Sequence, residues 1–242
     1  MGDAAVDVPV VVLESPRGRC SGAVVHQSGG QTWVLTAAHC VTDLGPTLSV
    51  RWQDEALAVV ATQTHPSYQN GPAFDVAVVQ IDGLRDTVPV VPLAATDDLK
   101  VGLPVEHFGF AHGASRGTVA EVRPLTLRYE DGPGGPCAGD SGGPDIVGGR
   151  LVGVMSRSDA LCREWAVSTR VSAVYDSFLA PLLFGAPMSL VPCAVCRQAA
   201  TEPGAACVAP QLRCNLTGEC GALAACACET CARECETDTL CR

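Results

Sequence analysis

Gly139-Asp140-Ser141-Gly142-Gly143-Pro144 is the segment that says most about this chain. A nucleophilic serine needs a tight, glycine-rich turn, because its Oγ must project and neighbouring N–H groups must converge on one point. That point is where a substrate carbonyl oxygen becomes negative. The hexapeptide therefore predicts Ser141 as a nucleophile, with the N–H groups of Gly139 and Ser141 forming an oxyanion hole. The alternative is an ordinary surface turn of Gly, Ser and Asp.

Two earlier segments supply partners for a serine nucleophile. Thr36-Ala37-Ala38-His39-Cys40 follows an apolar run, and its small residues let the histidine lie against a packed strand. Phe74-Asp75-Val76 places a carboxylate at the start of another apolar run, where it needs a donor such as a histidine N–H. Alone, each would be a structural histidine or a turn aspartate. Together, the order His39, Asp75, Ser141 predicts a catalytic triad.

These motifs resemble those of the chymotrypsin/trypsin family of serine proteases, over roughly Pro9 to Ala180. The resemblance implies an all-β fold of two packed six-stranded antiparallel β-barrels, with a C-terminal helix and the triad in the cleft between the barrels. It also implies a secreted serine endopeptidase that works through an acyl-enzyme, without metal or organic cofactor. Its partners would be protein or peptide substrates, with no nucleic acid and no membrane span.

The same resemblance assigns roles to residues near the triad. It implies two disulfides, Cys20–Cys40 and Cys137–Cys162. It also implies that the hydroxyl of Ser156 supports the triad aspartate.

Specificity is predicted from three positions that resemble the walls of the family's substrate pocket. Gly135 stands six residues before Ser141, where trypsin-like enzymes place an aspartate that pairs with basic side chains. Ser158 and Ala166 would line the walls. A pocket without a carboxylate is expected to favour uncharged residues over basic ones before the scissile bond.

The activation of the site is predicted from Asp140. In the family, a freed N-terminal ammonium inserts beside the aspartate that precedes the nucleophile. This chain starts Met1-Gly2-Asp3 and shows no leader pattern, so we expect an exported protein that has been trimmed. A buried charge without a partner is costly. We therefore expect a zymogen-like, partly collapsed oxyanion hole or, as the second option, an internal partner for Asp140, with His107 as the candidate.

Short apolar or alternating runs between turn residues continue from Val8 to Thr169 and predict an all-β protein. The predicted strands are Val10–Leu13, Ala23–His26, Trp33–Thr36, Leu48–Trp52, Val76–Ile81, Val105–Phe110, Thr118–Arg128 and Leu151–Ser156. One helix is predicted from the apolar spacing that begins at Val171, and Pro181 should limit its length.

The C-terminal part of the chain has a different character. Ten of the fourteen cysteines lie between Cys193 and Cys241, and this segment has no aromatic residue to help build a core. We predict a protease domain at 1–185, a linker at 186–192 and a cysteine-rich module at 193–242.

The density of cysteines in this module indicates disulfides and an oxidising compartment, hence a secreted, extracellular or periplasmic protein. Zinc is the alternative, but no histidine accompanies the tail cysteines, so no metal site is predicted. The module could bind a surface or a substrate, act as an inhibitory cap, or be an inert stabilising appendage.

The composition argues against some functional classes of protein and points to a source. A net charge of −10 argues against binding to nucleic acid or to an anionic membrane. Lys100 is the single lysine among 16 basic residues, and with many alanines this indicates a bacterial source. The alternative from another functional class is a protease-like binding module that no longer cleaves. The complete triad favours the enzyme.

Overall fold

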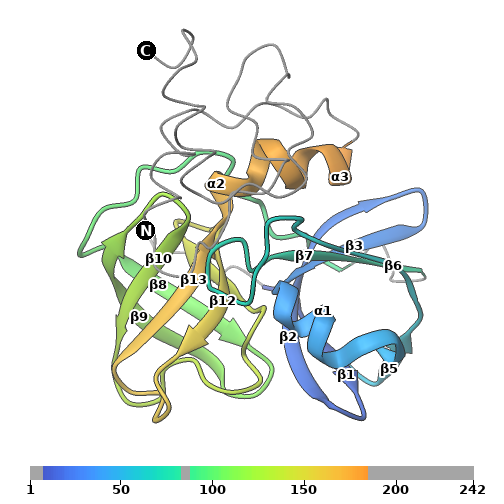
Figure 1. Ribbon diagram of the computed structural model, residues 1–242, viewed down its shortest axis with the longest axis horizontal. Helices are drawn as coiled ribbons and strands as arrows, with labels where there is room; N and C mark the ends of the chain where they lie inside the picture. Colours follow the sequence, from blue (N-terminus) through green and yellow to red (C-terminus); the bar gives the residue numbers. More distant parts are fainter. Residues whose placement is uncertain (1–7, 83–87, 185–242) are drawn as a thin grey trace, which may run out of the picture.

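The computed structural model describes residues 8–82 and 88–184 of the chain. Two antiparallel β-sheets stand side by side, one from each half of the described chain, and a helical segment lies across one end of them (Figure 1). This arrangement confirms the predicted all-β class with two barrel-like sheets and a C-terminal helix. The predicted linker and cysteine-rich module lie outside the described residues.

The first sheet has seven strands. They are β1 (Val10–Ser15), β2 (Gly18–Ser28), β3 (Gln31–Thr36), β4 (Ser49–Trp52), β5 (Glu55–Leu57), β6 (Val59–Thr64) and β7 (Ala77–Asp82). Their order is β5-β4-β1-β2-β3-β7-β6. Only Ala58 separates β5 from β6, yet these strands form the two edges of the sheet. The sheet therefore curls until its edges meet, as a barrel requires.

The second sheet is a closed barrel of six strands. They are β8 (Pro104–Gly109), β9 (Gly113–Val122), β10 (Thr126–Asp131), β11 (Pro144–Val147), β12 (Arg150–Ser158) and β13 (Trp165–Arg170). The closed order is β10-β13-β12-β11-β8-β9. The run Thr118–Arg128, predicted as one strand, is the end of β9 and the start of β10, because the chain turns at Arg123–Leu125. Leu127, Tyr129 and Ala166 are fully buried inside this barrel.

Two helical segments flank the sheets. Helix α1 (Ala38–Leu44) and the 3₁₀ turn η1 (Gly45–Thr47) follow β3 directly. The C-terminal helix consists of α2 (Val171–Val174), the π-helical segment η2 (Tyr175–Leu179) and α3 (Ala180–Phe184). It begins where the sequence predicted but continues through Pro181, because a proline is tolerated in the first turn after the π segment. None of the described helices is long and apolar enough to cross a membrane.

Both predicted disulfides are present. Cys20 on β2 is bonded to Cys40 on α1, which ties the helix to the sheet. Cys137 is bonded to Cys162, which ties the segment before Ser141 to the loop between β12 and β13. One link thus holds the helix that carries His39, and the other holds the segment just before Ser141.

Candidate active site

Asp75 lies at the centre of the predicted triad, and its side chain is only 2% exposed. Its Oδ1 accepts the backbone N–H of His39 at 2.9 Å, and its Oδ2 lies 2.7 Å from Nδ1 of the same histidine. The Oγ of Ser156, on β12, donates to Oδ2 at 2.6 Å. These donors replace the water that a buried carboxylate loses. They also hold the His39 ring with Nδ1 towards Asp75.

His39 reaches this position because α1 starts directly after β3. Ala37 and Ala38 are fully buried, so the helix begins in contact with the sheet, as their small size predicts. The His39 side chain remains 25% exposed. One edge of the imidazole is thus fixed by a buried carboxylate, and the ring still reaches solvent.

Ser141 lies beside the same disulfide that contacts His39. The Sγ of Cys40 is 3.7 Å from His39 Nε2 and 3.6 Å from the carbonyl oxygen of Ser141. That carbonyl also accepts the N–H of Ser21, on β2, at 2.8 Å. Among the described residues, no group forms a hydrogen bond with Ser141 Oγ. Such bonds are often long in enzymes without substrate and tighten when it binds.

The turn around Ser141 depends on glycine for both conformation and space. Gly139 has φ +98° and Gly142 has φ +82°, in the left-handed region. A Cβ at Gly142 would lie 2.3 Å from the Ser21 carbonyl oxygen, and one at Gly143 would lie 2.1 Å from that of Phe108. The backbone N–H groups of Gly139 and Ser141 have no acceptor in the described part of the chain.

Asp140 has an internal partner, but it is not the predicted one. Its Oδ2 lies 2.7 Å from Nδ1 of His112 and accepts the N–H of Cys137 at 3.0 Å. Its Oδ1 accepts the N–H groups of Ala111 at 3.1 Å and of His112 at 3.2 Å. The expectation that His107 fills this role is wrong. His112 escaped prediction because nothing local in the sequence marks a contact across 28 residues.

His107 instead lies inside the second barrel between two carboxylates. Its Nδ1 is 2.7 Å from Asp145 Oδ1, and its Nε2 is 3.0 Å from Asp131 Oδ1. Burial acts to lower the pKa of His107, but the charges of Asp145 and Asp131 and their hydrogen bonds outweigh it and raise the pKa to about 9. The imidazole is therefore a buried cation at neutral pH. Asp131 and Asp145 were not singled out from the sequence.

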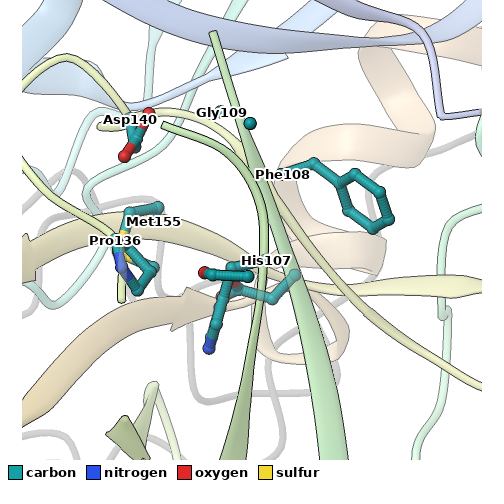
Figure 2. A pocket seen from close by; sticks show the side chains of 9 residues that line it. His107, Phe108, Gly109, Pro136, Asp140 and Met155 are labelled. Carbon is teal, nitrogen blue, oxygen red and sulfur yellow. The ribbon is translucent and has the colours of Figure 1, made fainter. Parts of the chain in front are cut away.

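A small, partly open pocket of about 10 Å³ borders residues of both histidine–aspartate groups. His107, Asp140, Asp145 and Met155 are among its lining residues. Figure 2 shows the Asp140 carboxylate near Gly109 at one end of the pocket and the His107 side chain apart from it. Gly109 has to be glycine here, because a Cβ would lie 2.1 Å from Asp140 Oδ1.

The predicted specificity residues lie in neighbouring parts of the second barrel. Ser158, on β12, is paired with Ala166, on β13. Ala166 is in turn paired with Tyr129 on β10. Gly135 is buried just beyond the end of β10, where a Cβ would lie 2.8 Å from the Cβ of Asp131.

The fold and this group of side chains define a two-barrel β protein with serine, histidine and aspartate where the two sheets meet. A family model described as Trypsin matches residues 5–178. The chain therefore belongs to the trypsin family of serine proteases and their homologues.

Two relatives illustrate the range of this similarity. The chymotrypsin-like protease VLCTLP of Macrovipera lebetinus is 27% identical over 200 residues, covering 65% of this chain and 74% of that protein. The snake venom serine protease homolog KN4 of Trimeresurus stejnegeri is 27% identical over 210 residues, covering 68% and 77%. Both come from snakes, so they lend no support to the bacterial source predicted from composition.

Solved structures support the fold. Human heparin binding protein superposes with a TM-score of 0.61 at 20% identity, covering 69% of this chain and 88% of that one. Neuropsin, a serine protease expressed in the limbic system of mouse brain, gives a TM-score of 0.57 at 22% identity, covering 69% and 90%. At these identities the comparison bears on the fold alone.

Proposed function

We propose that this chain is a serine endopeptidase that hydrolyses peptide bonds through an acyl-enzyme. One observation supports this above all others. The buried carboxylate of Asp75 accepts two hydrogen bonds from His39, whose Nε2 contacts the same sulfur atom as the carbonyl of Ser141. An oriented imidazole beside a serine in a glycine-rich turn is the arrangement that activates a hydroxyl nucleophile.

The chemistry assigns one role to each group. His39 removes the proton of Ser141 Oγ as that oxygen attacks the substrate carbonyl carbon. The N–H groups of Gly139 and Ser141 stabilise the negative oxygen of the tetrahedral intermediate. His39 then protonates the leaving amine, and the C–N bond breaks to give the acyl-enzyme. Water, activated by His39, releases the acid. Asp75 orients His39 and stabilises its charged form throughout.

The state of the oxyanion hole is part of this proposal. The sequence alone favoured a zymogen-like site. The four contacts to Asp140, together with N–H groups of Gly139 and Ser141 that find no acceptor among residues 8–82 and 88–184, support an assembled site instead.

For specificity, we propose a preference for uncharged residues before the scissile bond. The absence of a side chain at Gly135 supports this, because a basic substrate side chain would find no carboxylate at that residue. Cleavage of a randomised peptide library, with the products identified by mass spectrometry, should give small or medium apolar residues at that position. A profile dominated by Arg or Lys would contradict the assignment.

The compartment and the tail complete the proposal. The two described disulfides, and relatives that are named as venom proteins, support an exported protein. We propose that residues 193–242 form a separate disulfide-linked, metal-free module that binds a surface or a substrate.

A catalytically silent binding module is the alternative. It is favoured by the lack of a hydrogen bond to Ser141 Oγ among the described residues, and one relative is itself named a protease homolog. A fluorophosphonate probe distinguishes the two, because it reacts only with an activated serine. The proposed enzyme should be labelled on the peptide that contains Ser141, and Ser141→Ala should not be labelled. A wild type that resists the probe would favour the silent module.

A further inference from the structure

The carboxylate of Asp140 is held by one short stretch of backbone and one imidazole. The N–H groups of Ala111 and His112 donate to Oδ1, and the His112 ring lies 2.7 Å from Oδ2. The remaining donor, Cys137 N–H, belongs to the same turn as Asp140 itself. The Asp140 side chain is only 5% exposed, whereas that of His112 is 44% exposed. Of these donors, only the imidazole can carry a charge to balance the carboxylate.

The same loop also fixes the other side of the turn. Ser21 Oγ donates to the carbonyl of Gly139 at 2.9 Å and accepts the N–H of Phe110 at 3.0 Å. A Cβ on Gly139 would lie 2.9 Å from the Ala111 Cβ, so the two segments are in direct contact. The segment 110–112 therefore sets the orientation of the peptide groups on both sides of Asp140. The peptide group after Asp140 provides the N–H of Ser141, and the one before it fixes the carbonyl of Gly139, whose own N–H is the other donor.

We propose that His112 is a positioning residue, which holds Asp140 and thereby keeps the oxyanion hole assembled in this chain. The inference rests on the proposed function. It adds that the side-chain partner of Asp140 comes from the chain's own β8–β9 loop. Assembly of the site then requires the His112 side chain.

Three variants test the role of His112. His112→Leu removes the donor, and kcat for a peptide amide should fall on the order of 10- to 100-fold. Removal of an oxyanion-hole donor lowers kcat by about 10²–10³-fold, and here the donors are displaced but still present. KM should change little, since the substrate pocket is untouched. His112→Asn keeps a neutral donor and should recover most of the lost kcat. Arg116→Gln, an exposed change on the adjacent β9, is the matched control and should leave both constants unchanged.

A second measurement does not depend on how the variants fold. Lys100 is the single lysine, so in Lys100→Arg the terminal amine is the one remaining primary amine for an acetylating reagent. The acetylated protein should keep the kcat of the untreated one. Loss of activity on acetylation would overturn the inference, because a terminal ammonium would then be the partner that matters.

The outcomes separate this inference from the proposed function. Variants are compared per folded molecule, with folding followed by circular dichroism and thermal unfolding. If the wild type hydrolyses the substrate and His112→Leu matches it, the positioning role is refuted while the enzyme stands. If the wild type neither hydrolyses peptides nor reacts with a fluorophosphonate, both fall together.

Discussion

Three hydrogen bonds from two different sheets meet at the carboxylate of Asp75. Two come from His39, next to the first sheet, and one comes from Ser156, on β12 of the second. A charge-assisted bond of this kind contributes more than a neutral one, and a lost donor leaves buried charge unsatisfied. The orientation of His39 thus depends on a residue 81 positions away from Asp75.

Ser156→Ala should therefore lower kcat/KM without unfolding the protein. The lost bond corresponds to about 1–2 kcal/mol, or roughly a tenfold loss in kcat/KM. Steady-state hydrolysis of a chromogenic peptide measures it, and Ser49→Ala, a hydroxyl deletion on β4, serves as the control. An unchanged rate in Ser156→Ala would show that Asp75 does not need this donor.

At the scale of elements, the nucleophile turn is where the second half of the chain packs closely against the first. Gly142 donates its N–H to Met155 on β12 at 2.7 Å. A Cβ there would lie 2.2 Å from Thr36 Oγ1 on β3 and 2.3 Å from the Ser21 carbonyl oxygen on β2. At Gly142 the turn therefore requires a left-handed backbone and leaves no space for a side chain.

Two glycine substitutions separate these effects. Gly148 has φ +57° and open space around its missing Cβ, so Gly148→Ala should cost only about 1 kcal/mol of left-handed strain. Gly142→Ala adds a clash with backbone and should destabilise by at least about 3 kcal/mol. Urea denaturation of the two variants measures the difference. Equal losses would mean that the contact between the two sheets is not tight at Gly142.

The strands that sequence could predict are runs rich in apolar residues that become buried. β1, β3, β7 and β12 agree with the predicted runs to within a few residues. β6 was missed because it is an edge strand whose residues are mostly exposed, so it lacks the alternation that marks a strand. β11, which follows the nucleophile turn, was missed because it has only four residues.

The candidate site was predictable where the chemistry leaves a local motif. His39, Asp75 and Ser141 each stand in a short segment whose small or apolar neighbours explain the residue. The partner of Asp140 has no such segment, because His112 reaches it only after β8 and the nucleophile turn have folded together. His107 lies two residues before Gly109 in the sequence, but as a residue of β8 its ring turns into the barrel, towards Asp145.

At the scale of the whole molecule, the buried cation His107 makes stability depend on pH. Its folded pKa of about 9 lies above the value of about 6.5 expected for an unfolded imidazole. The folded state therefore binds this proton more tightly. The resulting stability is fully present below about pH 6.5 and is lost as the pH rises through 9.

The free energy of unfolding should accordingly fall by roughly 3 kcal/mol between pH 6.5 and pH 9.5. Urea denaturation at the two pH values measures the change. His26→Gln is the control, because His26 contacts Trp33 and Phe184 and has no carboxylate partner among the described residues. A wild-type stability that does not vary over this range would contradict the buried ion pairs of His107.

The site as a whole exists only when both halves of the chain come together. His39 and Asp75 belong to the first half, whereas Ser141 and Ser156 belong to the second. Because of this division, catalytic activity requires that both halves of the chain are folded against each other.

The central claim is that Ser141 is the nucleophile of a peptidase, and kcat/KM for a peptide amide in the wild type and in Ser141→Ala tests it most directly. The triad mechanism predicts a loss on the order of 10⁴-fold or more, down to the residual rate that substrate binding and the oxyanion hole supply. A Ser141→Ala protein that hydrolyses the same amide within tenfold of the wild-type value would contradict it.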